Sequence, residues 1–580
     1  MKRRATLFEG VCLFIRSHGF FYHILLELLL KLKSTSTSVE VFLYSNRVLC
    51  TANIDESHKL RGDVSMYTPE IQEVIRLAKD YNLIPVVRHL LADTETPIRV
   101  FQHLYQEPRA FLLESVEGGV KWARYSFIGS DPFLMIKAKH GKTMVETQTE
   151  NKVSDEKPID VLKAYLRSYS SPQLADLPRF TGGAVGFFGY DLLQYYENLP
   201  AHQIDDLQMN DIQFMFCDQV IVFDHFKQQI KVIANVHVQP FATDADIVKA
   251  YHATCEKIDA TIEKIKRPLG SETMTHNPIV TEPDLGDIRS NITKEKYIAN
   301  VNKAKEYIRA GDIFQVVLSQ RFEMETTVSP LQVYRVLRTM NPSPYMYVLK
   351  MDDEVIVGTS PELLVRVEEE KVETRPIAGT RPRGKTPEED LALEKELLAD
   401  EKERAEHLML VDLGRNDIGR VSEFGTVKCD TFMDIERYSH VMHIVSNVSG
   451  KIAKDKDFFD AFLSCMPAGT VSGAPKLRAM EIIAELEPES RGAYAGAIGY
   501  LGFSGNLDTC ITIRTIIFKN GKAYVQAGAG IVWDSVPESE YQETVNKATA
   551  LLKSIRMAEA MFSPEPRPVS DINKDYFVNS

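Results

Sequence analysis

Apolar residues recur every three or four positions in several stretches of the chain. The clearest stretch is 293–310, where Gly311 follows and ends the pattern, as expected at the C-terminal end of a helix. Residues 68–77 show the same spacing after a Thr-Pro pair, which favours a helix start with the threonine as N-cap. The spacing also predicts two longer helices, at 387–413 and 536–557.

Shorter runs rich in β-branched and aromatic residues lie between these stretches and predict strands. They occupy 110–115, 220–223, 313–322, 345–349, 355–358, 498–503, 509–518 and 523–527, and the runs at 355–358 and 363–367 suggest a hairpin. Helices and strands are mixed without the regular alternation of a doubly wound parallel sheet. The pattern therefore favours an α+β fold with largely antiparallel sheets flanked by helices.

Composition divides the chain into four parts. Residues 1–65 begin with a basic cluster and hold an apolar run that is too short and too charged to span a membrane. This extension is either an organellar targeting segment or the result of a start codon assigned too far upstream. Residues 267–290 carry three prolines and two glycines, which predicts a boundary between an N-terminal lobe at 66–285 and a second lobe at 290–560. A polar tail follows at 561–580.

The bulk composition is that of an acidic globular protein. The 580 residues are 44% hydrophobic and 26% charged, with a net charge of −13. This charge argues against a nucleic-acid partner, because phosphate binding needs clustered lysine and arginine. The seven cysteines are scattered and form no CxxC pair, so neither a disulfide framework nor a zinc site is expected. We expect a cytoplasmic protein without membrane attachment, with organellar targeting by the N-terminal extension as the open alternative.

Two pairs of glutamates are spaced to share a helix face. Glu403 and Glu406 fall in one predicted helix and Glu540 and Glu543 in another, each pair three residues apart. Facing carboxylates of this kind suit a hard divalent cation such as Mg²⁺. A solvated helix face is the simpler interpretation of acidic residues, but Glu406 runs directly into an apolar segment and so lies near the core.

Three glycine-containing loops could bind an anion. The loop 375–384 holds three arginines, two prolines and two glycines, and it suits a carboxylate unless it is simply a solvated turn. The turn 469–476 places glycines, two hydroxyl groups and Lys476 before a helix at 477–486, and such a helix start favours binding of a carboxylate. The turn lacks the Gly-Lys-Ser/Thr ending of a phosphate loop, so an ATPase is not expected. The segment 526–530 lets a ligand approach the backbone.

Two polar residues interrupt apolar strands. Arg514 occupies a half-buried strand position and needs an anionic partner there. His443 is either a core histidine or, beside a metal and a carboxylate ligand, a proton-transfer group.

Together these segments resemble the chorismate-utilising enzymes, and among them the anthranilate synthase component I subunits, over nearly all of residues 66–560. The matching motifs are 311–320, 341–346, 358–362, 375–384, 405–413, 507–509 and 526–530. The resemblance implies a complex chorismate-binding fold and a defined reaction. Chorismate binds with Mg²⁺, ammonia adds at ring carbon C2 as the C4 hydroxyl leaves, and loss of pyruvate gives anthranilate, the first committed step of tryptophan biosynthesis.

The resemblance also implies roles for particular residues. Glu406 and Glu543 match the Mg²⁺ ligands, and Glu362 matches the general acid for the leaving hydroxyl. His443 and Thr470 match further active-site residues. The matching chorismate contacts are Gly379, Thr380, Tyr494, Arg514, Gly528, Ala529 and Gly530.

Two positions separate this chain from its implied relatives. Aminodeoxychorismate synthases carry a nucleophilic lysine where this chain has Ala378, and isochorismate synthases carry a water-activating lysine where it has Gln315. Both differences favour ammonia as the nucleophile. Aminodeoxychorismate synthase component I remains the alternative enzyme, and a non-catalytic chorismate- or tryptophan-binding regulator is the alternative from another class.

The resemblance further implies regulation and a partner. Ser115, Pro344, Tyr345 and Met346 match a tryptophan feedback site, with Glu114 and Cys510 nearby. Tryptophan bound there would bias the relative orientation of the two lobes. The chain has no segment resembling a glutamine amidotransferase, so ammonia from glutamine would come from a separate small subunit, and a heterotetramer is expected.

Overall fold

The computed structural model describes residues 39–44, 47–52, 66–115, 124–269, 283–438 and 441–562. Most of the N-terminal extension, with its apolar run, and nearly all of the polar tail therefore lie outside the described residues. The chain divides into two compact units, Met1–Met66 and Tyr67–Ser580. In the first unit, β1 (Val39–Tyr44) and β2 (Arg47–Ala52) form an antiparallel hairpin. Among the described residues, no helix has both the length and the apolar character that a membrane crossing requires.

Two large sheets form the second unit, and every strand pair in them is antiparallel. The first sheet consists, in spatial order, of β13 (Arg289–Ser290), β14 (Gln315–Glu325), β26 (Lys522–Ile531), β25 (Thr515–Lys519), β16 (Glu354–Ser360), β15 (Tyr345–Met351), β4 (Arg109–Glu114), β5 (Tyr125–Ser130), β11 (Gln219–Asp224), β12 (Gln229–His237) and β3 (Leu83–Leu91), with β22 (Gly473–Ala474) beside β14.

The second sheet is similar in size. It consists of β19 (Ile377–Pro382), β21 (Val441–Lys451), β18 (Lys371–Thr374), β17 (Leu363–Glu368), β24 (Leu507–Ile511), β23 (Ala497–Gly502), β9 (Gly183–Phe188), β10 (Ile212–Cys217), β6 (Leu134–Lys139), β7 (Lys142–Thr147) and β8 (Asn151–Ser154), with β20 (Lys428–Arg437) beside β21. Both sheets draw strands from either side of residues 267–290, so that segment divides the sequence but not the sheets.

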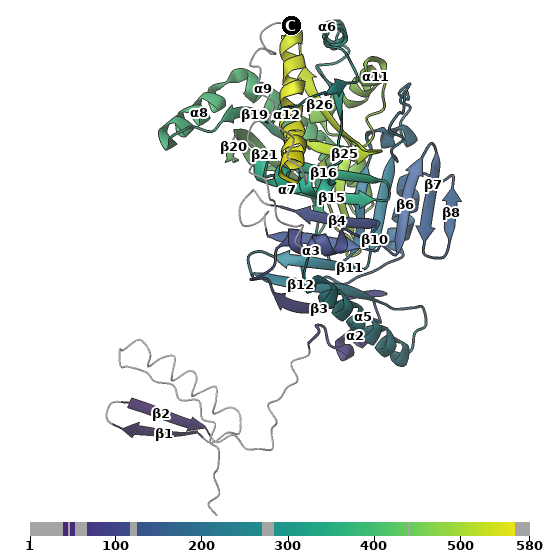
Figure 1. Cartoon of the computed structure of the whole chain (residues 1–580), viewed down its shortest axis with the longest axis vertical. Coiled ribbons are helices and arrows are strands. Elements are labelled where there is room, and N and C mark those ends of the chain that lie inside the picture. The colour runs from purple at the N-terminus through teal and green to yellow at the C-terminus, as the bar shows by residue number, and fades with distance from the viewer. Residues whose placement is uncertain are drawn as a thin grey trace, which may run out of the picture. The chain divides into compact units, whose positions relative to one another are not determined.

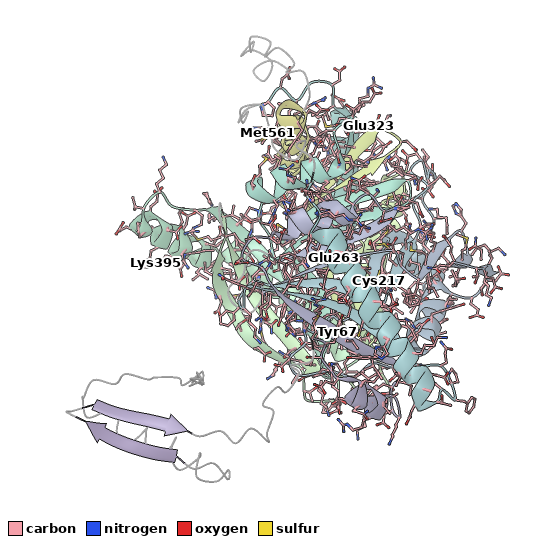
Figure 2. The ribbon with its side chains drawn as sticks, turned by 60° about the horizontal axis from the view of Figure 1, so that its bottom comes forward. Tyr67, Cys217, Glu263, Glu323, Lys395 and Met561 are labelled. Carbon is pink, nitrogen blue, oxygen red and sulfur yellow. The ribbon has the colours of Figure 1, made fainter. Side chains whose placement is uncertain are left out.

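Helices cover the outer face of each sheet. They are α2 (Ile71–Leu77), α3 (Pro97–Leu104), α4 (Pro158–Arg167), α5 (Asp244–Ile265), α6 (Lys294–Ala310), α7 (Pro330–Met340), α8 (Pro387–Ala399), α9 (Glu401–Gly419), α10 (Phe458–Cys465), α11 (Lys476–Leu486) and α12 (Pro537–Phe562), with the 3₁₀ turns η1 (Tyr190–Tyr195) and η3 (Gly469–Val471). Helix α12 packs along β26 and α7 (Figure 1). Helix α8 projects outward, with Lys395 on its exposed side (Figure 2). The predicted α+β class, with antiparallel sheets flanked by helices, is confirmed.

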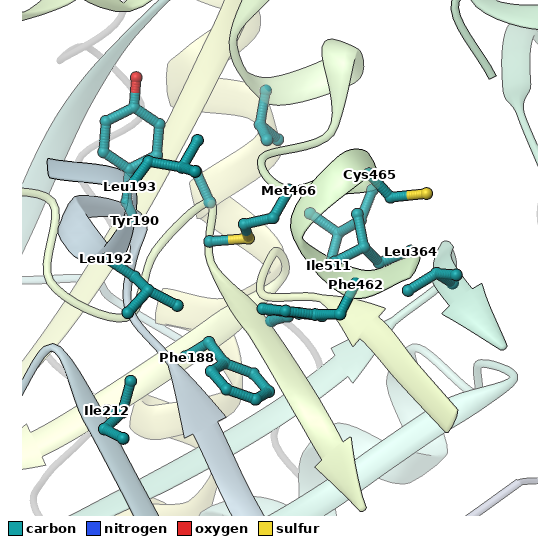
Figure 3. Close-up of a cluster of buried hydrophobic side chains, with 14 of the residues drawn as sticks. Phe188, Tyr190, Leu192, Leu193, Ile212, Leu364, Phe462, Cys465, Met466 and Ile511 are labelled. Atoms are coloured by element: carbon teal, nitrogen blue, oxygen red, sulfur yellow. The ribbon is translucent and has the colours of Figure 1, made fainter. Parts of the chain in front are cut away.

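The period-two pattern of the strands explains this layering. In β15, Tyr347 and Leu349 join a core shared with Met215 of β10, so this core lies between the two sheets. Their neighbour Val348 faces the other way and packs against the helices that cover the first sheet. A further core lies under the helices of the second sheet, where the rings of Phe188 and Phe462 are 4.0 Å apart between centroids (Figure 3).

The predicted helix ends are confirmed where neighbouring residues alone determine them. Helix α6 starts after Thr293, whose side chain accepts from the Lys296 N–H, and it ends at Gly311 with φ of 82°. The helix predicted over 387–413 is instead two helices, α8 and α9. They are separated by Asp400, whose carboxylate caps the start of α9 by accepting two backbone N–H groups.

Three local predictions were wrong because tertiary pairing overrode them. The single strand expected at 509–518 is two strands of different sheets, β24 and β25, and Arg514 lies in the segment between them rather than in a strand. The backbone of Thr68 forms a bridge with Val87, so α2 starts only at Ile71, with Glu70 as N-cap. The suggested hairpin of 355–358 with 363–367 does not form, because β16 pairs with β15 and β25 in the first sheet while β17 belongs to the second.

Candidate active site

The chain passes between the two sheets several times, and the candidate site lies at two of these crossings. After β16 it leaves the first sheet and enters β17 of the second, and Glu362 occupies that crossing. After β24 it returns from the second sheet to β25, and Arg514 occupies the return. The two segments are joined by hydrogen bonds: the Ile511 N–H donates to the Glu362 carbonyl at 3.0 Å, and the Ser360 hydroxyl donates to the Ile511 carbonyl at 2.7 Å.

Glu362 is a buried carboxyl group with an unusual pKa. Its side chain lines a cavity of about 40 Å³ together with Thr470, Gly469 and Ile511. Burial raises the pKa of Glu362 to about 8, because the carboxylate form loses hydration. The Thr470 hydroxyl is near enough to lower this pKa, but it makes no hydrogen bond of good geometry within the described part of the chain. Glu362 is therefore largely protonated at pH 7 and can donate a proton.

His443 is oriented by the backbone of the neighbouring strand. Its Nδ1 lies 2.9 Å from the Gly379 carbonyl oxygen and 3.1 Å from the Thr380 hydroxyl oxygen. A carbonyl oxygen can only accept, so Nδ1 carries the hydrogen and Nε2 has a free lone pair. Burial lowers the pKa of His443, and the nearby positive charge of Arg514 lowers it further. The imidazole is therefore neutral at pH 7.

Gly379 makes this contact possible. A register shift in the β19–β21 pairing lies between Ala378 and Thr380, and Gly379 has φ of 70°, a left-handed conformation that favours glycine. A Cβ atom here would come within 3.1 Å of Leu397 Cδ1 and 3.2 Å of Ile444 Cδ1. The bulge therefore depends on glycine.

Arg514 presents its guanidinium group to the site. Within the described part of the chain, no carboxylate forms an ion pair with its guanidinium, although burial lowers its pKa. Its φ is 52°, and Ala495, just after Tyr494, has φ of 62°. Both residues hold a backbone conformation that is strained for a residue with a side chain, and such strain concentrates at functional sites. The arrangement suits an anionic ligand.

The glycine-containing end of β26 forms a surface that side chains would block. A Cβ on Gly528 would lie 2.9 Å from the Tyr494 hydroxyl, and one on Gly530 would lie 2.6 Å from Gln315 Nε2. Tyr494 keeps its proton, since burial raises its pKa to about 12. Ala529 points the opposite way, into the core under the second sheet, so it can contact a ligand only through its backbone.

Glu406 of α9 and Glu543 of α12 lie close together. Burial and then the charges of Glu403 and Glu543 raise the pKa of Glu406; the pKa of Glu540 is raised by burial and, to a lesser extent, by Glu543. A divalent cation would relieve this repulsion. Mg²⁺ commonly uses one or two protein carboxylates and keeps several waters, so the donors fit it, although no group of three or more acidic, histidine or cysteine ligands is assembled among the described residues.

Lys547 is a site residue that the sequence analysis missed. Its ammonium group lies 2.6 Å from Glu543 Oε1 and donates to the Gly528 carbonyl at 2.9 Å. It is also near enough to Glu362 to affect the pKa of that carboxyl. The sequence signal was available, because Lys547 lies one helical turn after Glu543, where an oppositely charged pair is expected.

The cations of two predicted anion loops are already paired, which corrects the sequence interpretation. Arg375 pairs with Glu436, Arg383 with Asp390 at 2.8 Å, and Arg381 with Asp400 at 2.8 Å. Lys476 pairs with Asp417 at 3.0 Å and donates to two backbone carbonyls. These side chains attach the loops to the rest of the protein, and among the described cations of the site Arg514 is the one without an ion-pair partner.

A second cavity of about 80 Å³ lies between the two sheets. All four residues of the predicted feedback site line this cavity: Ser115, Pro344, Tyr345 and Met346. Glu114 and Cys510 also line it. Arg366 closes one side by donating to Asp508 at 2.9 Å and to the Tyr345 hydroxyl at 2.9 Å. Aromatic walls with a few polar groups are typical of a small-molecule site.

Comparisons with known proteins agree with this architecture. A family model described as chorismate binding enzyme matches residues 109–553. Anthranilate synthase component 1 of Acetivibrio thermocellus is 55% identical over 498 residues, covering 85% of this chain and 99% of that protein. The protein of the same name from Aquifex aeolicus is 49% identical over 492 residues, covering 84% and 98%. The crystal structure of anthranilate synthase component I from Streptococcus pneumoniae aligns with a TM-score of 0.66 at 41% identity, covering 75% and 93%.

Proposed function

Because this chain belongs to the anthranilate synthase component 1 family of chorismate-binding enzymes, we propose that it converts chorismate and ammonia into anthranilate, pyruvate and water, the first committed step of tryptophan biosynthesis. The structural observation that carries this proposal is the buried, protonated Glu362, which lies near Lys547 and whose chain segment is hydrogen-bonded to the segment that leads to the cation Arg514. Chorismate has two carboxylates and a hydroxyl that must leave, so it needs both kinds of group.

Different residues of the chain serve different steps of the proposed reaction. Arg514 and the backbone of Gly379 and Gly528–Gly530 bind and orient chorismate. Glu362 donates its proton to the C4 hydroxyl, which leaves as water while ammonia adds at C2. His443 offers Nε2, whose lone pair is free, to accept a proton as pyruvate is eliminated and the ring becomes aromatic.

A magnesium ion would be held by Glu406 and Glu543. When bound, it supplies Lewis-acid chemistry, withdrawing electron density from the ring through the ring carboxylate. The mutual repulsion of the glutamates on α9 and α12 supports this assignment. Lys547 neutralises part of that charge by pairing with Glu543.

Ammonia is favoured over the alternative nucleophiles. Ala378 has no side-chain nucleophile, which argues against aminodeoxychorismate synthase component I. Gln315, 4% exposed and directed at Gly530, cannot act as a base for water at neutral pH. We expect the ammonia to come from a separate glutamine amidotransferase component, in a heterotetramer with this chain.

The larger cavity is the proposed site for feedback inhibition by tryptophan. Its walls combine the aromatic residues Tyr125, Phe127 and Tyr500 with acidic and basic groups that could bind an amino acid's ammonium and carboxylate. The strand β24 separates it from the catalytic cavity, since Cys510 lines one and Ile511 the other. An occupant could therefore influence the backbone that holds Glu362.

One assay tests the catalytic proposal directly. The purified protein is incubated with chorismate, Mg²⁺ and ammonium chloride, and anthranilate is followed by its fluorescence. We expect anthranilate and an equal amount of pyruvate. Aminodeoxychorismate as the product would support the alternative enzyme, and no turnover at all would support a binding protein.

A further inference from the structure

A fully buried arginine lies beneath the candidate active site. Arg491 is in the loop between α11 and β23, and its side chain is 0% exposed. Its Nε and Nη2 atoms donate to the two carboxylate oxygens of Glu487, at 2.8 Å each. Glu487 is also buried. Burying two charges is favourable only when they are paired and their other hydrogen-bonding positions are filled, so the remaining partners of this ion pair are informative.

The other donors of Arg491 hold two backbone segments of the site. Nη1 donates to the Val471 carbonyl at 2.7 Å, and Nη2 also donates to the Val317 carbonyl at 2.8 Å. Val471 ends the turn that carries Thr470, and Val317 lies opposite Gly530 in the pairing of β14 with β26. A planar guanidinium that reaches both carbonyls fixes the spacing between the turn and the strand.

Glu487 holds the same strand at a second point. It accepts from the Ser319 N–H at 2.6 Å and from the Ser319 hydroxyl at 3.1 Å. Ser319 lies opposite Gly528 and accepts a further bond from Gln526 Nε2 at 2.8 Å. The ion pair therefore fixes β14 directly opposite both Gly528 and Gly530.

Arg491 also supports Tyr494. The Tyr494 N–H donates to the Arg491 carbonyl at 3.2 Å, and the guanidinium carbon lies 5.6 Å from the centre of the Tyr494 ring. The same guanidinium carbon lies 4.6 Å from the centre of the Tyr190 ring. These distances are typical of cation–π contacts. The Tyr494 hydroxyl in turn lies at Gly528.

We propose that Arg491 is a positioning residue for the chorismate site. Through its ion pair with Glu487, it fixes the Thr470 turn, the glycine surface of β26 and Tyr494 relative to one another, without touching the substrate. This inference rests on the proposed function, because chorismate turnover provides one of its two tests.

The kinetic test compares three variants in the ammonium-dependent assay. Arg491→Lys keeps the positive charge, but an ammonium group lacks the planar guanidinium that bonds to two carbonyls and a carboxylate at once. Glu487→Gln keeps the shape and removes the charge. We expect both to lower kcat/KM by about tenfold or more and to raise KM for chorismate. Glu354→Gln is the matched control. Glu354 is also buried, and it forms an ion pair with Lys519 at 3.2 Å. It is the first residue of β16, whereas Glu362 comes after the last residue of that strand.

The control variant should keep kcat/KM within about twofold of the wild type. Unchanged kinetics in folded Arg491→Lys and Glu487→Gln would overturn the proposal, and so would an equal loss in Glu354→Gln. If Arg491→Lys does not fold, Glu487→Gln decides the matter.

Crystallography gives a second readout that does not depend on turnover. Structures of the wild type and of Glu487→Gln should differ in the position of the Tyr494 hydroxyl or of the Thr470 turn, and unmoved groups would overturn the proposal. A wild type that makes no anthranilate would count against the proposed function, while this comparison would still decide the role of Arg491.

Discussion

The Nδ1 atom of His443 lies 2.9 Å from the carbonyl oxygen of Gly379, in a strand pair that a glycine bulge distorts. This single contact sets the tautomer of the imidazole and leaves Nε2 able to accept a proton. The bulge itself needs the left-handed φ of Gly379. A feature of the backbone thus fixes the tautomer of a proposed catalytic group.

Replacing His443 tests its role in proton transfer. His443→Asn keeps a donor toward Gly379 but removes the basic nitrogen, so we expect kcat to fall by about 10²-fold. Stopped-flow anthranilate fluorescence measures this, and circular dichroism checks that the variant is folded. A kcat equal to that of the wild type would exclude His443 as a proton acceptor.

The pH dependence of the reaction should report Glu362. Its carboxyl is protonated below its pKa of about 8 and loses the transferable proton above it. We therefore expect activity to fall as pH rises through about 8. In Glu362→Gln this alkaline limb should disappear and the remaining rate should be roughly 10²–10⁴-fold lower.

Glu354→Gln supplies the control for this profile. Glu354 is also a buried glutamate with a raised pKa, but it lies at the other end of β16. The variant Glu354→Gln should therefore keep the alkaline limb of the pH profile. A limb that survives in Glu362→Gln would assign the titration to another group.

Removing either proposed metal ligand should weaken Mg²⁺ binding. We expect Glu406→Gln and Glu543→Gln each to raise the Mg²⁺ concentration for half-maximal activity by about tenfold or more. Binding of Mn²⁺ followed by electron paramagnetic resonance provides a measurement that is independent of turnover. Glu388→Gln, on the exposed start of α8, is the control. Unaltered Mn²⁺ affinity in both ligand variants would refute the assignment.

Filling the larger cavity should remove feedback inhibition. A phenylalanine at Ser115 would occupy space that tryptophan needs, so we expect the concentration of tryptophan for half-inhibition to rise at least about tenfold in Ser115→Phe. Ammonium-dependent kcat without tryptophan should stay within about twofold. Ser168→Phe, at an exposed position, is the control. Inhibition that persists unchanged in Ser115→Phe would place the tryptophan site elsewhere.

The N-terminal extension should be dispensable for catalysis. All proposed catalytic, metal and tryptophan contacts belong to the unit Tyr67–Ser580, so a protein beginning at Met66 should keep kcat and KM within about twofold. Steady-state kinetics of this shortened protein and of the full chain provide the comparison. A large loss of activity would show that the extension contributes to the site.

The sequence predicted most of the candidate site because its motifs are contiguous. Glu362 and Thr470 were assigned from short segments, and the structure brings them into one cavity although 107 positions separate them. Arg491 and Lys547 were missed for different reasons. Lys547 had a helical-spacing signal that was not used, whereas Arg491 lies in a loop where no periodicity marks burial.

The sequence by itself determined the fold class, the family and the local signals. The cap at Thr293 and the stop at Gly311 depend only on neighbouring residues, so local chemistry decides them. Tertiary structure alone decided which cations remain free. Arg381 and Arg514 are the same residue type, but Arg381 pairs with Asp400, 19 residues away at the start of α9, whereas no carboxylate among the described residues forms an ion pair with Arg514. Antiparallel pairing between distant segments leaves no period in the sequence, so the sheet order and the unpaired charge at Arg514 emerge only when the chain is folded.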